Sequence, residues 1–162
     1  MRAFAVSLCG NFATADDLMQ DALLKAWGHA ASFQPGTNMR AWLFTILRNT
    51  FYSLYRKRTR EVADPDGEYA ERLSVPPAQE AGIEMSEFRR ALAKLSDEHR
   101  EVLVMVGASG MSYEETAEIC GVAVGTIKSR VNRARARLGA LLGIDGAEEI
   151  GPDAKVLSVV RG

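Results

Sequence analysis

The sequence predicts an all-α protein of two small helical domains joined by a flexible linker. Apolar residues recur every three or four positions along most of the chain, which is the spacing of one face of an α-helix. No segment alternates convincingly between apolar and polar residues, as a half-buried β-strand would. The helical spacing fails between about residues 61 and 83, where proline, glycine and acidic side chains gather, as is typical of a linker. We therefore expect helical domains at 1–60 and 84–142, a linker at 61–83 and a tail at 143–162.

The first domain is predicted to contain a short helix followed by two longer ones. Phe4 and Leu8 share one face of the short helix, which Gly10 ends, and Thr14 is expected to cap the next helix. The core-facing side of that helix is predicted to carry Met19, Leu23, Trp27 and Ala30. The stretch "SFQPGTN" breaks the pattern, and Asn38 can cap the third helix, whose apolar stripe is Leu43, Leu47, Phe51 and Leu54.

The second domain is predicted to contain four helices. The first is lined by Met85, Phe88, Leu92 and Leu95. Ser96 can cap the second, whose buried side is expected to hold Val102, Leu103 and Val106, and Gly107 and Gly110 bound the turn that follows. Ser112 and Glu115 form a capping box at the start of the third helix. The fourth is a long basic helix.

Composition and length indicate a soluble globular protein. The chain has 162 residues, of which 47% are hydrophobic and 25% charged. It contains no apolar run long enough to span a bilayer, and its start, "MRAFAVSLCG", does not resemble a secretion signal. We expect a cytoplasmic protein in which Cys9 and Cys120 are reduced thiols and neither His29 nor His99 serves a metal or a reaction.

The net charge of −1 conceals a division of charge along the chain. Residues 1–60 carry 8 basic and 3 acidic side chains, residues 61–111 carry 5 and 11, and residues 112–142 carry 5 and 3. All five basic residues of the last segment lie between Val124 and Leu138, where there is no acidic residue. Because a phosphate backbone responds to local potential, these basic segments predict contact with nucleic acid.

The stretch "SYEETAEICGVAVGTIKSRVNRAR" has the spacing of a helix-turn-helix, with a turn at Gly121 and with Ala117 small enough for two helices to approach closely. Four apolar residues on the second helix repeat at core spacing: Ile127, Val131, Ala134 and Leu138. The polar residues between them must then face outward, which suits a helix in the major groove of DNA. These residues are Lys128, Ser129, Arg130, Asn132 and Arg133. A solvated basic face is the plain alternative.

The first basic segment, "RAWLFTILRNTFYSLYRKR", mixes aromatic and cationic side chains. Its aromatic residues cannot all lie on one packing stripe, so some should be exposed beside Arg48, Arg56, Lys57 and Arg58. Exposed aromatics beside cations can stack unpaired bases along a phosphate track. A broad core face that ends in basic residues explains the same pattern equally well.

The quoted segments also resemble a known family. "ADDLMQDALLKAW", "SFQPGTNMRAWLFTILRNT" and "LSDEHREVLVMVGASGMSYEETAEICGVAVGTIKSRVNRARARL" are similar, in this order, to the second and fourth conserved regions of bacterial sigma factors of the extracytoplasmic-function class. The resemblance covers about residues 1–142 and is nearest to the general-stress subgroup of alphaproteobacteria. It implies a promoter-recognition subunit of RNA polymerase for a stress regulon, and no enzymatic activity.

The resemblance assigns further roles to individual residues. It implies that Asp17, Gln20 and Asp21 bind core RNA polymerase. It also implies that Phe33, Asn38 and Asn49 form a pocket for a base flipped out of the minus-ten element, which requires a shaped stacking surface. The five outward-facing residues of the basic helix match positions that read the minus-thirty-five element as duplex.

The resemblance implies three partners, which are core RNA polymerase, promoter DNA and an anti-sigma factor. It implies no metal, cofactor or membrane insertion. Family members usually have residues before the position of Met1, so the first domain is expected to be truncated or its start misassigned. An alternative function is a sigma-like adaptor that sequesters an anti-sigma factor without binding DNA. Such adaptors normally add a receiver domain and lose the cations of the recognition helix, whereas this sequence has no receiver and keeps its cations. A simple helix-turn-helix repressor would leave the first domain unexplained.

Overall fold

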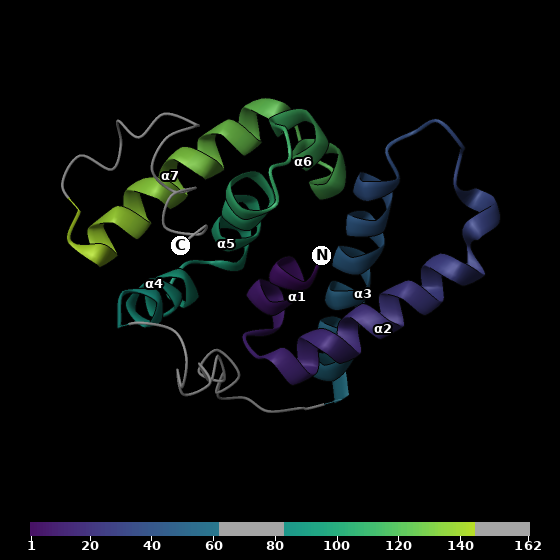
Figure 1. Cartoon of the computed structure of the whole chain (residues 1–162), viewed down its shortest axis with the longest axis horizontal. Helices are drawn as coiled ribbons and strands as arrows, with labels where there is room; N and C mark the ends of the chain where they lie inside the picture. The colour runs from purple at the N-terminus through teal and green to yellow at the C-terminus, as the bar shows by residue number, and fades with distance from the viewer. Residues whose placement is uncertain (62–82, 145–162) are drawn as a thin grey trace. The chain divides into compact units, whose positions relative to one another are not determined.

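The structure is a computed structural model that describes residues 1–61 and 83–144, without the side chains of 58–61 and 83–84. Most of the predicted linker and tail therefore lies outside the described residues. The chain divides into two compact units, within Met1–Ser74 and Val75–Gly162. All regular elements among the described residues are helical, which confirms the predicted fold class (Figure 1). No helix in these two ranges is long and apolar enough to cross a membrane.

The described residues of the first unit form three α-helices and one short 3-10 turn. These are α1 (Arg2–Cys9), α2 (Phe12–Gly28), η1 (Ala30–Ser32) and α3 (Met39–Glu61). The chain turns between α1 and α2 at Gly10, whose φ of 78° is left-handed. The side-chain oxygen of Asn11 then accepts a hydrogen bond of 2.8 Å from the backbone N–H of Thr14. Asn11 is therefore the N-cap, and the prediction that Thr14 caps α2 was wrong.

The buried face of α2 is built mainly from alanine. Its buried residues are Ala15, Leu18, Ala22 and Ala26. The predicted core face was wrong, because Leu23, Trp27 and Ala30 are exposed and Met19 is only half-buried. Small side chains let α2 pack closely against α1 and α3, so the bulky apolar residues fall on its other sides.

α3 begins at the predicted cap, since the Oδ1 atom of Asn38 accepts a hydrogen bond of 3.0 Å from the N–H of Ala41. Among the α3 residues whose side chains are described, the buried ones are Ala41, Phe44, Leu47 and Thr50. The predicted stripe is thus shifted, because Leu47 is buried whereas Leu43, Phe51 and Leu54 are half-buried. Phe44 anchors the helix by stacking on Phe4 of α1 with ring centroids 5.2 Å apart.

The described part of the second unit, 83–144, forms α4 (Ile83–Ala93), α5 (Asp97–Leu103), the π-helical turn η3 (Val104–Ala108), α6 (Tyr113–Cys120) and α7 (Val124–Leu142). Ala91 and Leu95 pack with Leu138 of α7, and Phe88 and Leu92 flank them, so three of the four predicted positions join this cluster. The π turn inserts a residue into the helical repeat and moves burial to Val104 and Met105. Of the three residues predicted to be buried there, only Val102 is; Leu103 and Val106 are half-buried, and Gly107 lies inside the π turn.

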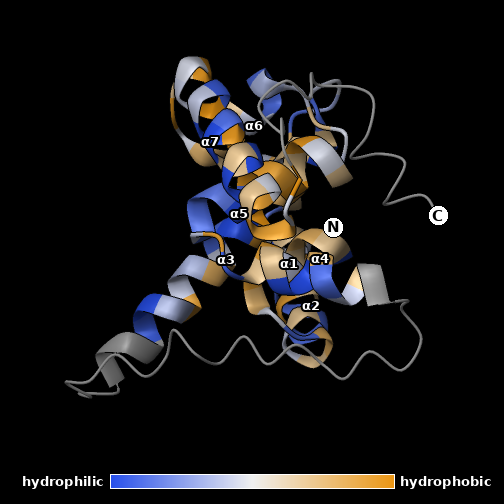
Figure 2. Cartoon of the chain, turned by 90° about the vertical axis from the view of Figure 1, so that its left-hand side faces the viewer, coloured by the Kyte–Doolittle hydropathy of each residue, from blue (hydrophilic) through white to orange (hydrophobic). Residues whose placement is uncertain are grey.

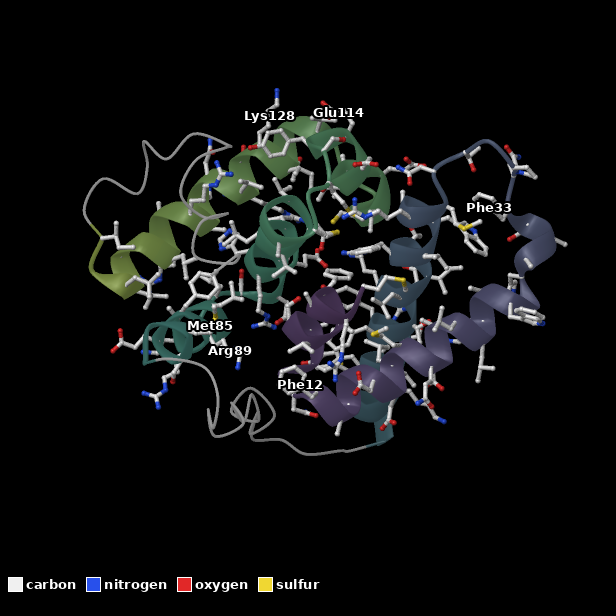
Figure 3. The ribbon with its side chains drawn as sticks, viewed as in Figure 1. Phe12, Phe33, Met85, Arg89, Glu114 and Lys128 are labelled. Atoms are coloured by element: carbon white, nitrogen blue, oxygen red, sulfur yellow. The ribbon has the colours of Figure 1, made fainter. Side chains whose placement is uncertain are left out.

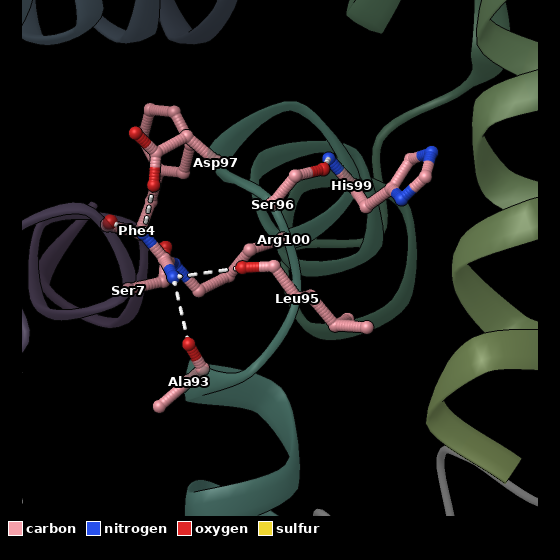
Figure 4. Close-up of polar contacts among 8 residues, drawn as sticks. All are labelled: Phe4, Ser7, Ala93, Leu95, Ser96, Asp97, His99 and Arg100. Carbon is pink, nitrogen blue, oxygen red and sulfur yellow. Dashed lines mark hydrogen bonds and ion pairs between the residues drawn. The ribbon is translucent and has the colours of Figure 1, made fainter. Parts of the chain in front are cut away.

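The corner between α4 and α5 is held by one arginine (Figure 4). The Nη1 atom of Arg100 donates hydrogen bonds to the carbonyl oxygens of Ala93 (3.4 Å) and Leu95 (3.3 Å), and Nη2 pairs with the Asp97 carboxylate. Ser96 caps α5 as predicted, accepting from the N–H of His99. Because Arg100 satisfies carbonyls that the end of α4 leaves open, the first turn of α5 has a defined position on α4.

Candidate functional site

α6 and α7 form the predicted helix-turn-helix. At the start of α6, Ser112 Oγ accepts from the N–H of Glu115 (3.0 Å), and Glu115 Oε2 accepts from the N–H of Ser112 (2.8 Å). This is the expected capping box. At its end Gly121 is left-handed, with φ of 68°, and the N–H of Val122 donates to the carbonyl of Ala117 (3.1 Å). The turn therefore needs glycine at position 121.

The inner face of α7 is the predicted one. Ile127, Val131, Ala134 and Leu138 are all buried, and Ala117 is buried on α6. α7 thus carries hydrophobic residues toward its own unit and hydrophilic residues elsewhere (Figure 2). Packing on one face fixes the rotation of the helix, so the opposite face is also determined.

The outer face of α7 carries four of the five predicted DNA-binding residues in exposed positions. They are Lys128, Ser129, Asn132 and Arg133. Figure 3 shows Lys128 directed away from α7. The Ser129 hydroxyl donates to the carbonyl of Gly125 (3.0 Å), which leaves its oxygen able to accept from a base amino group. The described part of α7 presents cations, a hydroxyl and an amide, the groups that read base edges and hold phosphates.

The fifth predicted residue, Arg130, has a different environment. Its Nη2 atom lies 3.0 Å from Oε2 of Glu98 on α5, and its side chain is 18% exposed. The two residues are 32 positions apart, so local periodicity could not show this contact. Among the predicted DNA contacts, Arg130 is the one with an ion-pair partner in the described residues.

The predicted base-capturing pocket is only partly assembled. Phe33, which is labelled in Figure 3, follows η1 and is half-buried. Its ring centroid lies 5.2 Å from that of Trp42 on α3. Asn38 lies between them in sequence, and its Oδ1 is used as the cap of α3. Asn49 is exposed, but it lies eleven residues after Asn38, about 16 Å further along the helix axis. The structure therefore brings together Phe33 and Trp42, and sequence reasoning did not assign a site role to Trp42.

Aromatic and basic side chains of α3 are interleaved, as expected. The guanidinium of Arg48 lies 4.8 Å from the ring centroid of Tyr52. Phe51 packs on both Tyr52 and Tyr55, at 5.3 and 6.2 Å. Tyr55 is 52% exposed, and Arg56 and Lys57 are also exposed, whereas the side chain of Arg58 lies outside the described residues. The exposed Tyr55 beside cations fits the base-stacking interpretation, whereas the half-buried Phe51 and Tyr52 fit the broad core face.

The predicted polymerase-binding residues form part of one exposed face of α2. Asp17, Gln20 and Asp21 are all exposed, and the same helical face continues with Leu24 and Trp27. Leu24 is 71% and Trp27 86% exposed, far more than is usual for such large apolar side chains. Sequence reasoning missed both residues as candidates. The alanines at positions 15, 22 and 26 share one face of α2. This spacing could have predicted a core face of alanines, with Trp27 exposed.

The carboxylate of Asp16, next to Asp17 on α2, pairs with Arg2 of α1. Asp16 accepts two hydrogen bonds of 3.0 Å from Nε and Nη2 of Arg2 on α1. These hydrogen bonds hold the pKa of the Asp16 carboxyl below its usual value. Because Asp16 joins α2 to α1, it belongs to the scaffold, whereas Asp17 and Asp21 on the exposed face are open to another molecule.

No group of three or more His, Cys, Asp or Glu residues in the described ranges is placed to hold a metal ion. Cys9 is half-buried and Cys120 is buried, and neither forms a disulfide bond among the described residues.

Two family models match the chain. The Sigma-70 region 2 model matches residues 1–61, and the Sigma-70, region 4 model matches residues 85–138. The chain is 61% identical over 162 residues to the ECF RNA polymerase sigma factor EcfG of Rhodopseudomonas palustris (strain TIE-1), covering all of this chain and 90% of that protein. It is 36% identical over 141 residues to the RNA polymerase sigma factor CnrH of Cupriavidus metallidurans, covering 80% and 74%.

Two solved structures are also similar. The sigma factor RpoE, in a co-crystal structure with the anti-sigma factor NepR from Bartonella quintana, matches with a TM-score of 0.79 and 54% identity. That match covers 89% of this chain and 90% of the other. CnrH in complex with the cytosolic domain of CnrY matches with a TM-score of 0.62 and 31% identity, covering 89% and 82%.

Proposed function

Because the chain belongs to the ECF sigma factors of RNA polymerase, which initiate transcription and are not enzymes, we propose that its two units divide promoter recognition between them. The boundaries that we propose are region 2 in 1–60 and region 4 in 84–142, as the sequence predicts. α7 reads the minus-thirty-five element as duplex, and the segment from Phe33 through α3 binds the melted minus-ten strand. The exposed face of α2 docks on core RNA polymerase.

One observation carries this proposal, namely the exposed polar face of α7 within a helix-turn-helix. An α-helix fits the major groove of B-DNA, where each base pair presents a distinct pattern of donors and acceptors. Lys128, Asn132 and Arg133 lie on the exposed side of a helix whose other side is fully buried. Two weak contacts to one promoter strengthen each other when the polymerase holds both units at the correct spacing.

The partners follow from the same membership. We propose core RNA polymerase, promoter DNA and a small anti-sigma factor, since the similar chains RpoE and CnrH were solved with NepR and CnrY. The genes transcribed form a stress regulon, because the chain resembles the general-stress subgroup and is 61% identical to EcfG. The protein acts in the cytoplasm, where its polymerase and promoters are.

Run-off transcription tests the proposed function. Purified core polymerase is mixed with the full chain and a library of promoters randomised in both elements. We expect selection of a two-part promoter and transcripts that depend on the chain. Absence of any promoter-specific transcript would contradict the proposal, and tight binding of an anti-sigma factor without transcription would indicate an adaptor instead.

Phe33 allows a test of the pocket. Phe33→Ala should slow open-complex formation about fivefold, because a stack on an unpaired base is worth about 1 kcal/mol or more and forms only after the strands separate. The rate is measured by permanganate reactivity of promoter thymines, on the promoter selected above.

Phe33→Leu is the matched control. Leucine keeps apolar contact with Trp42 but has no aromatic face, so it should be as slow as alanine if Phe33 stacks on a base. A leucine variant as fast as the parent would mean that Phe33 only packs on Trp42.

A further inference from the structure

Arg130 of the recognition helix pairs with a carboxylate of its own unit. Its guanidinium nitrogen Nη2 lies 3.0 Å from the Glu98 carboxylate, and only 18% of its side chain is exposed, against 62% for Glu98. Arg133, by contrast, is exposed. A guanidinium that is neutralised and largely covered is not available to a phosphate in the same way as an exposed one.

The position of Glu98 is well defined by its surroundings. It lies in the first turn of α5, between Asp97, which pairs with Arg100, and His99, whose N–H donates to the Ser96 cap. Glu98 therefore lies in a helical turn that the Ser96 cap fixes. α5 in turn packs on α7, which brings Glu98 to the flank of the recognition helix.

The pairing matters because Arg130 and Arg133 are three residues apart on one helix. Side chains at this spacing are neighbours on the helix surface, and like charges there repel each other. The Glu98 carboxylate offsets the charge of Arg130 and holds its side chain toward α5. Arg133 then faces the groove without the guanidinium of Arg130 beside it.

We propose that Glu98 is a positioning residue for promoter recognition, which keeps Arg130 on α5 and out of DNA contact. This inference rests on the proposed DNA binding by α7. Reading of base edges then falls to Ser129, Asn132 and Arg133. It follows that α7 offers DNA one cation fewer than its sequence contains, which limits binding to random sequence.

The salt dependence of DNA binding tests this role, because its slope counts phosphate contacts. The full chain is titrated with a short random-sequence duplex, followed by fluorescence anisotropy at several salt concentrations. Glu98→Gln should free Arg130, raise the magnitude of the salt slope by about one unit and tighten binding at low salt several-fold. Helical content should stay at the parent value.

The matched control makes the Glu98→Gln substitution in a chain that lacks Arg130. Arg130→Met is compared with the double variant Arg130→Met, Glu98→Gln, which has the same change of charge at the same place but no cation to release. The slope should be equal in these two variants. An equal effect of Glu98→Gln with and without Arg130 would overturn the proposal, since Glu98 would then act only as a distant charge.

Two other outcomes separate this inference from the proposed function. If the parent chain binds neither random nor promoter duplex, alone or in the holoenzyme, DNA binding by α7 is itself wrong. If the parent binds and Glu98→Gln weakens binding, Glu98 supports Arg130 as a direct DNA contact, and the positioning role is wrong.

Discussion

Replacing both Leu24 and Trp27 with serine is expected to weaken binding of the chain to core RNA polymerase about 30-fold or more. Tryptophan is enriched among the hot spots of protein interfaces, where removal of a side chain costs about 2 kcal/mol or more, and 2 kcal/mol is about 30-fold in affinity. Both side chains stand on the exposed face of α2, so their loss leaves its buried alanine face intact. Affinity is measured by titrating labelled core polymerase.

The three polar residues of the same face allow their effect on polymerase affinity to be compared with that of Leu24 and Trp27. Asp17, Gln20 and Asp21 are expected to form the rim of the contact, so replacing all three with alanine should weaken binding less than the apolar pair does. Tyr55→Ser is the control, because Tyr55 is an exposed aromatic of the same unit but lies on α3. If the variant with serine at positions 24 and 27 binds polymerase as tightly as the parent, this face of α2 is not the docking site.

Arg133→Ala is expected to relax the preference for one or two base pairs of the minus-thirty-five element. A base-contacting arginine contributes about 1–3 kcal/mol of discrimination, which corresponds to about 5-fold to 150-fold. Arg133 is exposed on the outer face of α7 and lies in the third turn of the helix, near enough to its start to reach base edges. The preference is measured by competition between single-base promoter variants at two salt concentrations.

Arg137 provides the matched comparison on the same helix. It is also exposed but lies one turn further from the start of α7, so Arg137→Ala should weaken binding to all sequences equally or have no effect. If both variants keep the base preferences and the salt slope of the parent, the polar face of α7 is only a solvated surface.

Local patterns in the sequence predicted much of the second unit. The capping box at Ser112, the turn at Gly121 and the buried stripe of α7 depend on neighbours within a few residues, and all three are confirmed. Burial after Val102 was less accurate, because a π turn changes the helical repeat without a marker in the sequence.

The first unit shows why other features could not be predicted in this way. Bulky apolar residues suggested a core face for α2 that included Trp27, yet close packing of helices selected the alanines. Asn11 and Thr14 are both acceptable caps, and only the turn at Gly10 decides between them. The pairs Glu98–Arg130 and Phe33–Trp42 join different helices or a loop and a helix, so they require the tertiary structure.

The exposure of Trp27 also gives the protein a built-in optical reporter. The chain has two tryptophans, and they differ in surroundings, since Trp27 is almost fully hydrated whereas Trp42 is half-buried against Phe33. Indole fluorescence shifts to shorter wavelength when water is removed from the ring. Emission from Trp27 should therefore shift when α2 is covered by a partner, and Trp27→Phe should abolish that shift. Unlabelled protein can thus report on which surface a tryptophan-free partner occupies, and how fast, in a stopped-flow mixing experiment.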